Sequence, residues 1–173
     1  AELLQEAGDR DAVLSLLMRF ASQAFEFTAL FVVQEGAAQG RLAAIRGQAP
    51  YSLETVSVPL DGGVFETVFR TQGYHLGPIG DAASDRAALG GMGRARPLSC
   101  ALVPVVVKAR VVLMLYGDSG AAGVRTNRIA RIAEFGHLVS AAFERLLLKR
   151  KLGQFDKKAA APAKPGTAEP ATP

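Results

Sequence analysis

The densest apolar pattern in the chain runs from Ser99 to Asp118, in the stretch SCALVPVVVKARVVLMLYGD. Two runs rich in Val and Leu flank Lys108, Ala109 and Arg110, and β-branched residues at this density fit strands better than a helix. Both runs are almost continuously apolar rather than alternating, which indicates strands covered on both faces. The pattern therefore predicts a central hairpin with helices packed on the sheet.

Helical periodicity marks both ends of the chain. Over residues 10–25, apolar side chains recur on two adjacent helical stripes, and Asp9 or Asp11 can cap the first turn. A second, longer helix with two apolar stripes is predicted from Thr126 or Asn127 to about Lys151. One stripe of each helix can cover the sheet. The other stripe either packs inside the same monomer or meets a second copy of the chain.

Between these helices the pattern predicts shorter elements. Pro59 cannot donate a hydrogen bond to a ladder, so it favours a strand end or a sheet edge. The predicted elements are strands at 28–34, 41–46, 54–58 and 74–76, a short helix at 64–70, and a short helix followed by a glycine-rich loop within 81–97.

The length and composition fit one domain. The chain has 173 residues, of which 49% are hydrophobic, enough for one ordinary core. We expect an N-terminal flank at 1–9, a domain at 10–151, and a disordered Ala/Pro/Lys-rich tail or linker at 152–173. No apolar run approaches the ~18 residues of a membrane span, and no signal peptide is visible. The expected location is therefore cytoplasmic, without a membrane span.

The formal net charge of +4 is concentrated near the C-terminus. Residues 145–164 hold seven Lys and Arg side chains against Asp156 alone, so the rest of the chain is slightly acidic. Such a terminal cluster is typical of a solvated helix end, and the chain has no Trp for base stacking. No nucleic-acid partner is expected.

Candidate reactive side chains are few. Cys100 is the single cysteine and begins a predicted strand, which favours a buried spacer over a reactive thiol. One thiol and two histidines are too few for a structural zinc site, and the sequence holds neither a phosphate loop nor a convincing acid–base pair. We therefore expect no catalytic residue, no metal and no cofactor, and we expect that the protein is not an enzyme.

Two positions keep a binding role open. His75, in a short strand-like run, can ligate a haem iron or titrate near neutral pH, although a partly exposed histidine without such a role is commoner. Arg94 and Arg96 follow the glycine-rich run Gly90–Gly93 and can shape an anion-binding lid. The alternative for this run is a flexible, solvated loop.

The order of elements resembles a GAF domain over roughly residues 10 to 150. The resemblance rests on Ala29–Val33, on Val58–Leu60, and most strongly on the two runs Ser99–Val105 and Arg110–Asp118, with a Pro in the first and a Leu-Tyr-Gly-Asp ending in the second. It implies an α+β fold with a central antiparallel sheet of about five or six strands. The N- and C-terminal helices would pack on one face, and small helices and loops would cover a ligand pocket on the other.

The resemblance also implies a role. Such domains are often sensory or regulatory modules inside larger signalling proteins, and they frequently dimerise through their terminal helices. The sequence lacks the cyclic-nucleotide signature of some members, a suitably placed cysteine for a bilin, and the several cysteines of members that reduce methionine sulfoxide. We therefore expect a non-catalytic regulatory module of a larger, bacterial-type signalling protein, which forms a homodimer and has room for a small ligand.

Two alternatives remain open at this point: a protein–protein interaction domain whose pocket is filled by its own side chains, and a small enzyme or cofactor binder. The residues expected at a ligand site share the face opposite the terminal helices or its glycine-rich loop: Phe65, Phe69, His75, Arg94, Arg96 and Met114. The residues expected at a dimer interface lie on the second stripes of the terminal helices: Leu14, Met18, Phe135, Leu138 and Ala142.

Overall fold

The predicted central hairpin is confirmed. In the computed structural model, which describes residues 8–159 and omits the side chains of 126, 128, 129 and 150–159, strands β6 (Cys100–Val107) and β7 (Arg110–Asp118) pair antiparallel. Strand β7 also pairs with β1 (Phe27–Gln34) on its other side. The strand that ends in Asp118 is therefore in the middle of the sheet.

Within residues 8–159 the sheet has seven strands, and all of its pairings are antiparallel. Its order is β3-β2-β1-β7-β6-β5, and β4 pairs with β2 beside β3. This arrangement confirms the α+β class. The remaining elements, in chain order, are α2 (Arg10–Ala24), β2 (Ala37–Ile45), β3 (Tyr51–Ser52), β4 (Ser57–Pro59), α3 (Gly63–Thr71), β5 (His75–Gly77), α4 (Ala83–Gly91), the 3-10 turn η1 (Gly120–Ala122) and α5 (Thr126–Ala159).

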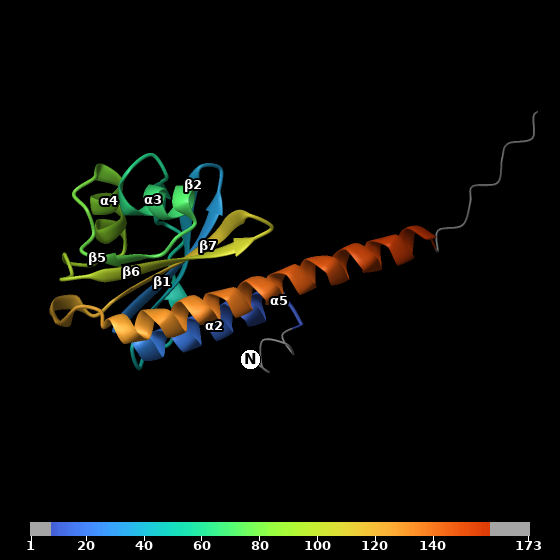
Figure 1. Ribbon diagram of the computed structural model, residues 1–173, viewed down its shortest axis with the longest axis horizontal. Helices are drawn as coiled ribbons and strands as arrows, with labels where there is room; N and C mark the ends of the chain where they lie inside the picture. Colours follow the sequence, from blue (N-terminus) through green and yellow to red (C-terminus); the bar gives the residue numbers. More distant parts are fainter. Residues whose placement is uncertain (1–7, 160–173) are drawn as a thin grey trace, which may run out of the picture.

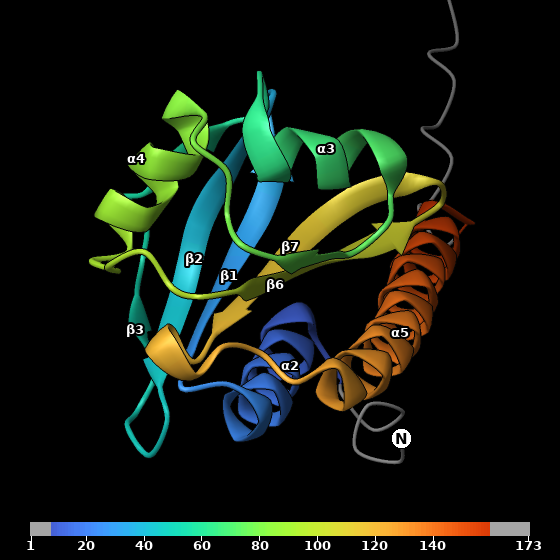
Figure 2. The same cartoon turned by 60° about the vertical axis from the view of Figure 1, so that its left-hand side comes forward.

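Helices cover both faces of the sheet. Helices α2 and α5 lie side by side on one face, and α3 and α4 lie on the other (Figure 1 and Figure 2). Side chains of β7 alternate between the two layers, so that Leu113 and Leu115 join the core under α2 and α5 while Met114 and Tyr116 join the core under α3 and α4. The continuous apolar run of β7 is explained by these two separate cores.

Two tight turns set the hairpin registers. The β1–β2 turn consists of Glu35 and Gly36, with φ angles of 51° and 76°, and the β6–β7 turn consists of Lys108 and Ala109, with φ angles of 49° and 60°. Positive φ at both central positions is the geometry that matches the twist of a hairpin. The second strand, expected at 41–46, therefore begins four residues earlier than predicted, because β2 starts at Ala37.

The region after β2 also differs from the sequence expectation. The strand expected at 54–58 is shorter and begins later, as β4 at Ser57, and a further two-residue strand, β3, precedes it. Pro59 ends β4, as its missing N–H group predicts. The first helix starts where expected, since Asp9 Oδ1 accepts a hydrogen bond from Ala12 N at 2.8 Å.

Helix α5 is the longest element, at 34 residues. It runs along the sheet beside α2 and then projects beyond the rest of the domain (Figure 1). It continues to Ala159, eight residues past the expected end near Lys151, and the remaining tail expected to be disordered, 160–173, lies outside the described residues, as does 1–7 of the expected flank. No helix within residues 8–159 has the length and hydropathy that crossing a membrane requires.

Candidate functional site

The face under α3 and α4 is filled by the chain's own side chains. Phe65 of α3 and Met114 of β7, both expected at a ligand site, are fully buried. The Phe65 ring meets Phe31 edge to face with a centroid distance of 5.2 Å, and Tyr116 is also fully buried in this layer. Two of the six expected ligand residues therefore form the core between the sheet and α3.

The other expected ligand residues do not converge on Phe65 and Met114. Phe69 lies at the surface with 38% of its area exposed. The Nε2 atom of His75 lies 3.2 Å from the carbonyl oxygen of Pro78, which accepts a hydrogen bond when Nε2 carries the proton. Arg96 donates to Asp81 Oδ1 at 2.7 Å, as an exposed ion pair at the edge of the domain.

His75 borders an open hollow of about 370 Å³ between α3 and the start of α4. Its lining is mostly small or polar: Gly63, Val64, Thr67, His75, Gly80, Asp81, Ala82 and Asp85. Asp85 is fully buried, and its two carboxylate oxygens accept from Val64 N at 2.9 and 3.1 Å. It thereby caps the first turn of α3 from another helix.

Two glycines make room for the Asp85 carboxylate. A Cβ atom at Gly63, where φ is 76°, would lie 2.5 Å from it, and a Cβ at Gly80 would lie 2.7 Å from it. Ser84 adds a second link, donating from Oγ to the carbonyl oxygen of Gly62 at 2.8 Å. These hydrogen bonds from Ser84 and Asp85 fix the first turn of α3 against the first turn of α4, and both turns line the hollow.

A buried ion pair lies at the end of β7. Arg94, in the loop between α4 and β6, donates from Nη2 to Asp118 Oδ1 at 2.6 Å and from Nε to Oδ2 at 3.0 Å. Asp118 is fully buried, whereas a quarter of the Arg94 side chain is exposed. The guanidinium also lies 4.7 Å above the ring centre of Phe27. The Nε and Nη2 donors of Arg94 are therefore already paired with a carboxylate of the same chain, in bidentate geometry.

Two further donors complete the Asp118 site. The Tyr116 hydroxyl donates to Oδ2 at 3.1 Å, and the backbone N–H of Gly120 donates to Oδ1 at 2.9 Å. Burial, followed by the negative charge of Asp118, raises the pKa of Tyr116 well above its ordinary value. The hydrogen bond to Asp118 raises the pKa of Arg94. The cluster is therefore charged only at Arg94 and Asp118, with Tyr116 as a neutral donor.

Cys100 lies directly across from Asp118 on β6 and is fully buried. Burial, and then the charges of Asp118 and Asp85, raise its pKa to about 12. The thiol therefore stays protonated near neutral pH, and a thiolate nucleophile is disfavoured here. No group of three or more His, Cys, Asp or Glu side chains suited to a metal ion occurs within the part of the chain that the structure describes.

The Asp118 cluster connects the α4–β6 loop to the start of α5. Asp118 is followed directly by the connection 119–125, and Leu98 N donates to the carbonyl oxygen of Gly120 at 3.0 Å. Ser99 Oγ accepts from Val124 N at 2.8 Å, two residues before α5. Together with the Arg94–Asp118 pair, these bonds tie the loop to the segment from which α5 begins.

The residues expected at a dimer interface fall into two groups. Leu14, Met18 and Ala142 are at most 3% exposed and belong to the core between the terminal helices and the sheet. Phe135 is half-buried and stacks on Phe20 of α2, with ring centres 4.0 Å apart. Leu138 alone among the five has a largely exposed side chain, at 41%.

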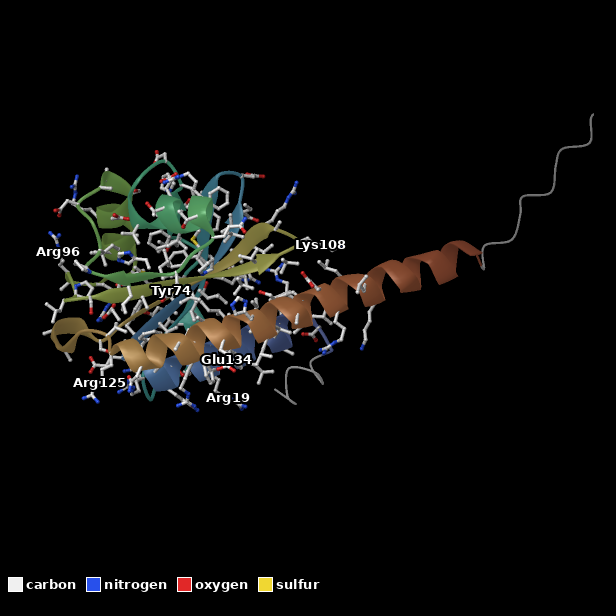
Figure 3. All side chains as sticks on the ribbon, viewed as in Figure 1. Arg19, Tyr74, Arg96, Lys108, Arg125 and Glu134 are labelled. Atoms are coloured by element: carbon white, nitrogen blue, oxygen red, sulfur yellow. The ribbon has the colours of Figure 1, made fainter. Side chains whose placement is uncertain are left out.

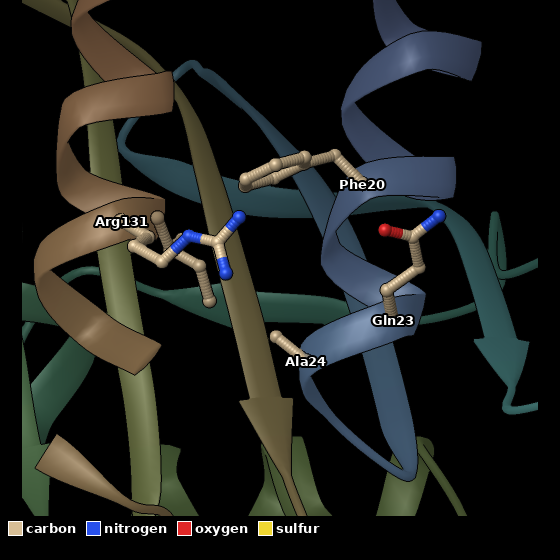
Figure 4. A pocket seen from close by; sticks show the side chains of 5 residues that line it. Phe20, Gln23, Ala24 and Arg131 are labelled. Carbon is tan, nitrogen blue, oxygen red and sulfur yellow. The ribbon is translucent and has the colours of Figure 1, made fainter. Parts of the chain in front are cut away.

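A shallow pocket of about 310 Å³ opens between α2 and α5 beside the Phe20–Phe135 stack. Figure 4 shows Phe20, Gln23 and Ala24 on one helix facing Arg131 on the other. Farther out, Arg19 and Glu134 lie on the solvent side of this helical layer (Figure 3). The groove between α2 and α5 therefore has apolar side chains at its base and charged side chains along its solvent-exposed edges.

Comparison with known proteins gives matches at the level of structure. No protein-family model matches the chain, and no curated protein matches it. A methyl-accepting chemotaxis protein fragment, residues 122 to 287, superimposes with a TM-score of 0.64 at 21% identity, covering 85% of this chain and 94% of that chain. The second GAF domain of DevS from Mycobacterium smegmatis gives 0.63 at 16% identity, covering 83% and 99%.

The fold is that of a GAF domain. A third structure with the same fold, a type II free methionine-R-sulfoxide reductase from Thermoplasma acidophilum, gives a TM-score of 0.56 at 10% identity, covering 79% of this chain and 95% of that chain. The GAF fold thus occurs in both a chemotaxis protein and an enzyme among these neighbours. Because one fold serves such different roles, the fold by itself does not define the function of this chain.

The sequence left open whether Arg94 shapes an anion-binding lid or lies in a solvated loop, and in the structure its guanidinium pairs with Asp118 of the same chain. Neither Asp118 nor Asp85 was recognised as a structural anchor. The signal for Asp118 was its place at the end of an almost wholly apolar strand, because a carboxylate buried there requires a cation or several N–H donors. The sequence did not reveal which of the nearby arginines provides it.

Proposed function

We propose that this GAF domain is a non-catalytic regulatory module of a larger cytoplasmic signalling protein, and that it self-associates through its terminal helices. The structural similarity to domains from a chemotaxis protein and from DevS supports a signalling role. A single, buried and protonated cysteine supports a role without thiol chemistry and fits a reducing compartment.

The observation that carries the proposal is the Arg94–Asp118 link. It joins the loop that leaves α4 to the segment that begins α5, and α5 is the element that extends away from the domain (Figure 1). A buried bidentate pair resists separation, since separation leaves the buried Asp118 carboxylate without its cation. A displacement of the α4–β6 loop would therefore be transmitted to the start of α5. A module of this shape can in that way regulate a domain attached to the far end of α5.

Hydrogen exchange on the whole chain tests this transmission. Replacing Arg94 with Gln removes the ion pair, and we expect faster amide exchange both in the loop 92–99 and in the connection 119–125. Arg96→Gln is the matched control, because its partner Asp81 is exposed and lies outside this link. Faster exchange confined to the loop, with 119–125 unchanged, would show that the loop and α5 are independent and would contradict the proposal.

A second candidate function is a pure protein-interaction domain. The specific observation in its favour is the filled face under α3 and α4, where Phe31, Phe65 and Met114 take the place in which a ligand was expected. The site left for a small ligand is the hollow of about 370 Å³ beside His75 and Asp85. A native mass spectrum of freshly purified protein separates the two: added mass that is lost in His75→Ala supports a ligand, and the bare chain mass supports the interaction domain.

A further inference from the structure

The groove between α2 and α5 combines one charged, one amide and three apolar side chains. Its volume is about 310 Å³, and the residues that line it are Phe20, Gln23, Ala24, Arg131 and Ile132. Clefts of about this size hold small organic molecules when apolar walls are combined with a few polar groups that fix the orientation of the ligand. The groove lies on the face of the sheet opposite the hollow beside His75, so the two are separate sites (Figure 2).

An aromatic ring and a buried aliphatic side chain form the apolar part of the groove. The Phe20 ring is half-buried and is held by Phe135, whose ring stacks on it with centres 4.0 Å apart and planes 16° from parallel. Ile132 is 1% exposed and lies at the base. Ala24 has only a methyl group, so it takes up little of the space beside the ring. The groove therefore offers a fixed apolar surface against which a flat ring can pack.

Among the described residues that line the groove, only Arg131 carries a charge. Figure 4 shows its guanidinium projecting from α5 toward α2, between Phe20 and Ala24. None of the ion pairs found among the described residues involves Arg131. Glu134, three positions later on α5, lies on the solvent side of the helical layer and does not neutralise it (Figure 3). The groove therefore has an unneutralised positive charge beside its apolar surface.

The donors in the groove select the class of ligand. A guanidinium donates hydrogen bonds and cannot accept them, so a ligand beside Arg131 has to supply an acceptor. A carboxylate does so in bidentate geometry, as Asp118 does for Arg94 elsewhere in this chain. The Gln23 amide can donate to the same carboxylate. A phosphate group fits less well, because its second charge and additional oxygens would lie against apolar walls without a second cation.

We propose that the groove between α2 and α5 binds a small aromatic monocarboxylate, with the carboxylate on Arg131 and Gln23 and the ring against Phe20 and Ile132. This site goes beyond the proposed regulatory role and does not depend on it. An occupant contacts both terminal helices, so its binding stabilises their packing near the start of α5.

An NMR titration of the whole chain with phenylacetate locates the site. We expect saturable shifts of the amide signals of residues 20–24 and 130–133. Phenylacetamide has the same shape without the charge, and acetate has the same charge without the ring. Each should bind at least ~10-fold more weakly, because each lacks one of the two contacts. No saturable shift in these two segments, or shifts confined to the hollow beside His75, would overturn the proposal.

Two arginine variants separate a specific pairing from general attraction of anions. Arg131→Gln should weaken phenylacetate binding about tenfold, because a charge-assisted hydrogen bond is lost. Arg19→Gln is the matched control, because Arg19 is exposed on the solvent side of the same helical layer and does not line the groove (Figure 3). It should change the affinity by less than ~2-fold. Equal weakening in the two variants would show general attraction alone and would contradict the site.

Filling the groove provides a test that leaves every charge unchanged. Ala24→Leu places a larger side chain beside the Phe20 ring and should abolish phenylacetate binding, whereas Ala24→Ser conserves the size of the side chain and should retain it. Circular dichroism melting curves show whether both variants are folded. Undiminished binding to a folded Ala24→Leu protein would place the ligand elsewhere, and the arginine pair decides the matter if that variant does not fold.

Protein concentration and hydrogen exchange complete the test. The phenylacetate affinity should be the same in dilute and concentrated protein, whereas an affinity that falls with concentration would mean that a second copy of the chain fills the groove, contrary to the proposal. Phenylacetate should also slow amide exchange in both 19–25 and 130–135. Slower exchange in only one of these segments would show that the ligand does not bridge the two helices.

Discussion

The two faces of the sheet are built in different ways. The face under α2 and α5 is an apolar core to which long, regular helices contribute Val13, Leu17 and Val139. The face under α3 and α4 combines aromatic packing around Phe65 with two fully buried carboxylates, each satisfied by donors from another element. The comparison shows that one face is held mainly by the packing of long helices, whereas the other also depends on buried polar links between short elements and loops.

The largest loss of stability is expected when a large side chain is removed from the core under α3 and α4. Phe65→Ala should lower the free energy of unfolding by about 4 kcal/mol, because a fully buried ring is lost and the rigid surroundings leave a cavity. Phe69→Ala, on the same helix but 38% exposed, should cost under ~1 kcal/mol. Urea denaturation of both variants measures this contrast, and equal losses would show that the face is not packed as described.

The buried ion pair should come next. Arg94→Met leaves the Asp118 carboxylate buried with only the Tyr116 hydroxyl and the Gly120 amide, and about 3 kcal/mol should be lost. Arg96→Met removes an exposed pair and should change stability by under ~0.5 kcal/mol. The same denaturation experiment compares them. A near-neutral Arg94→Met would mean that the polar links of this face do not stabilise it.

Alkaline pH should weaken this face. The folded-state pKa of Cys100 is raised to about 12 and that of Tyr116 is also raised, so above their unfolded values the unfolded chain releases protons that the folded chain retains. The stability they contribute is complete below about pH 8.5 and is lost as the pH rises toward 12. At pH 10 the loss through Cys100 should be about 1 kcal/mol.

The control for this pH effect is Cys100→Ala. Thermal unfolding between pH 8 and pH 10 should show a steep decline for the natural chain and a shallower one for the variant, which retains only the contribution of Tyr116. Parallel pH profiles for the two proteins would contradict the assignment to the buried thiol.

The smallest expected effect lies in the turn that connects the two central strands, outside both cores. Ala109 has a φ of 60°, a conformation that glycine adopts without the steric cost borne by a Cβ, so Ala109→Gly should stabilise the protein by about 1 kcal/mol. Ala87→Gly, at an exposed position of α4, should destabilise it by a similar amount, because glycine weakens a helix. Opposite shifts in melting temperature are expected, and a decrease for both would contradict the turn geometry.

Much of the fold was predictable because it follows from local patterns. The run 99–118 indicated two covered strands, and the stripes of 10–25 and 126–151 indicated long helices with more apolar surface than one contact needs. The elements between them were less well predicted. A two-residue turn with a positive φ at Glu35 has no strong signal apart from Gly36, and the short strands β3 and β4 depend on pairing with β2.

The candidate site was predicted in its parts and not in its arrangement. Arg94 was predicted to help bind an anionic ligand, whereas in the structure its guanidinium pairs with Asp118, 24 positions away in the sequence. Leu14, Met18 and Ala142 were placed on an interface because their stripes are apolar, yet a stripe covered by a neighbouring helix and an exposed one have the same sequence pattern.

The sequence alone determined the hairpin, the terminal helices and the apolar stripes along them, because periodicity and β-branching act within a few residues of each other. Only the tertiary structure decided which aromatic rings fill the face under α3 and α4, which arginine neutralises Asp118, and which stripe residues of the terminal helices stay exposed. These outcomes depend on which distant segments come together, and a buried charge or an apolar stripe specifies only the kind of partner it requires.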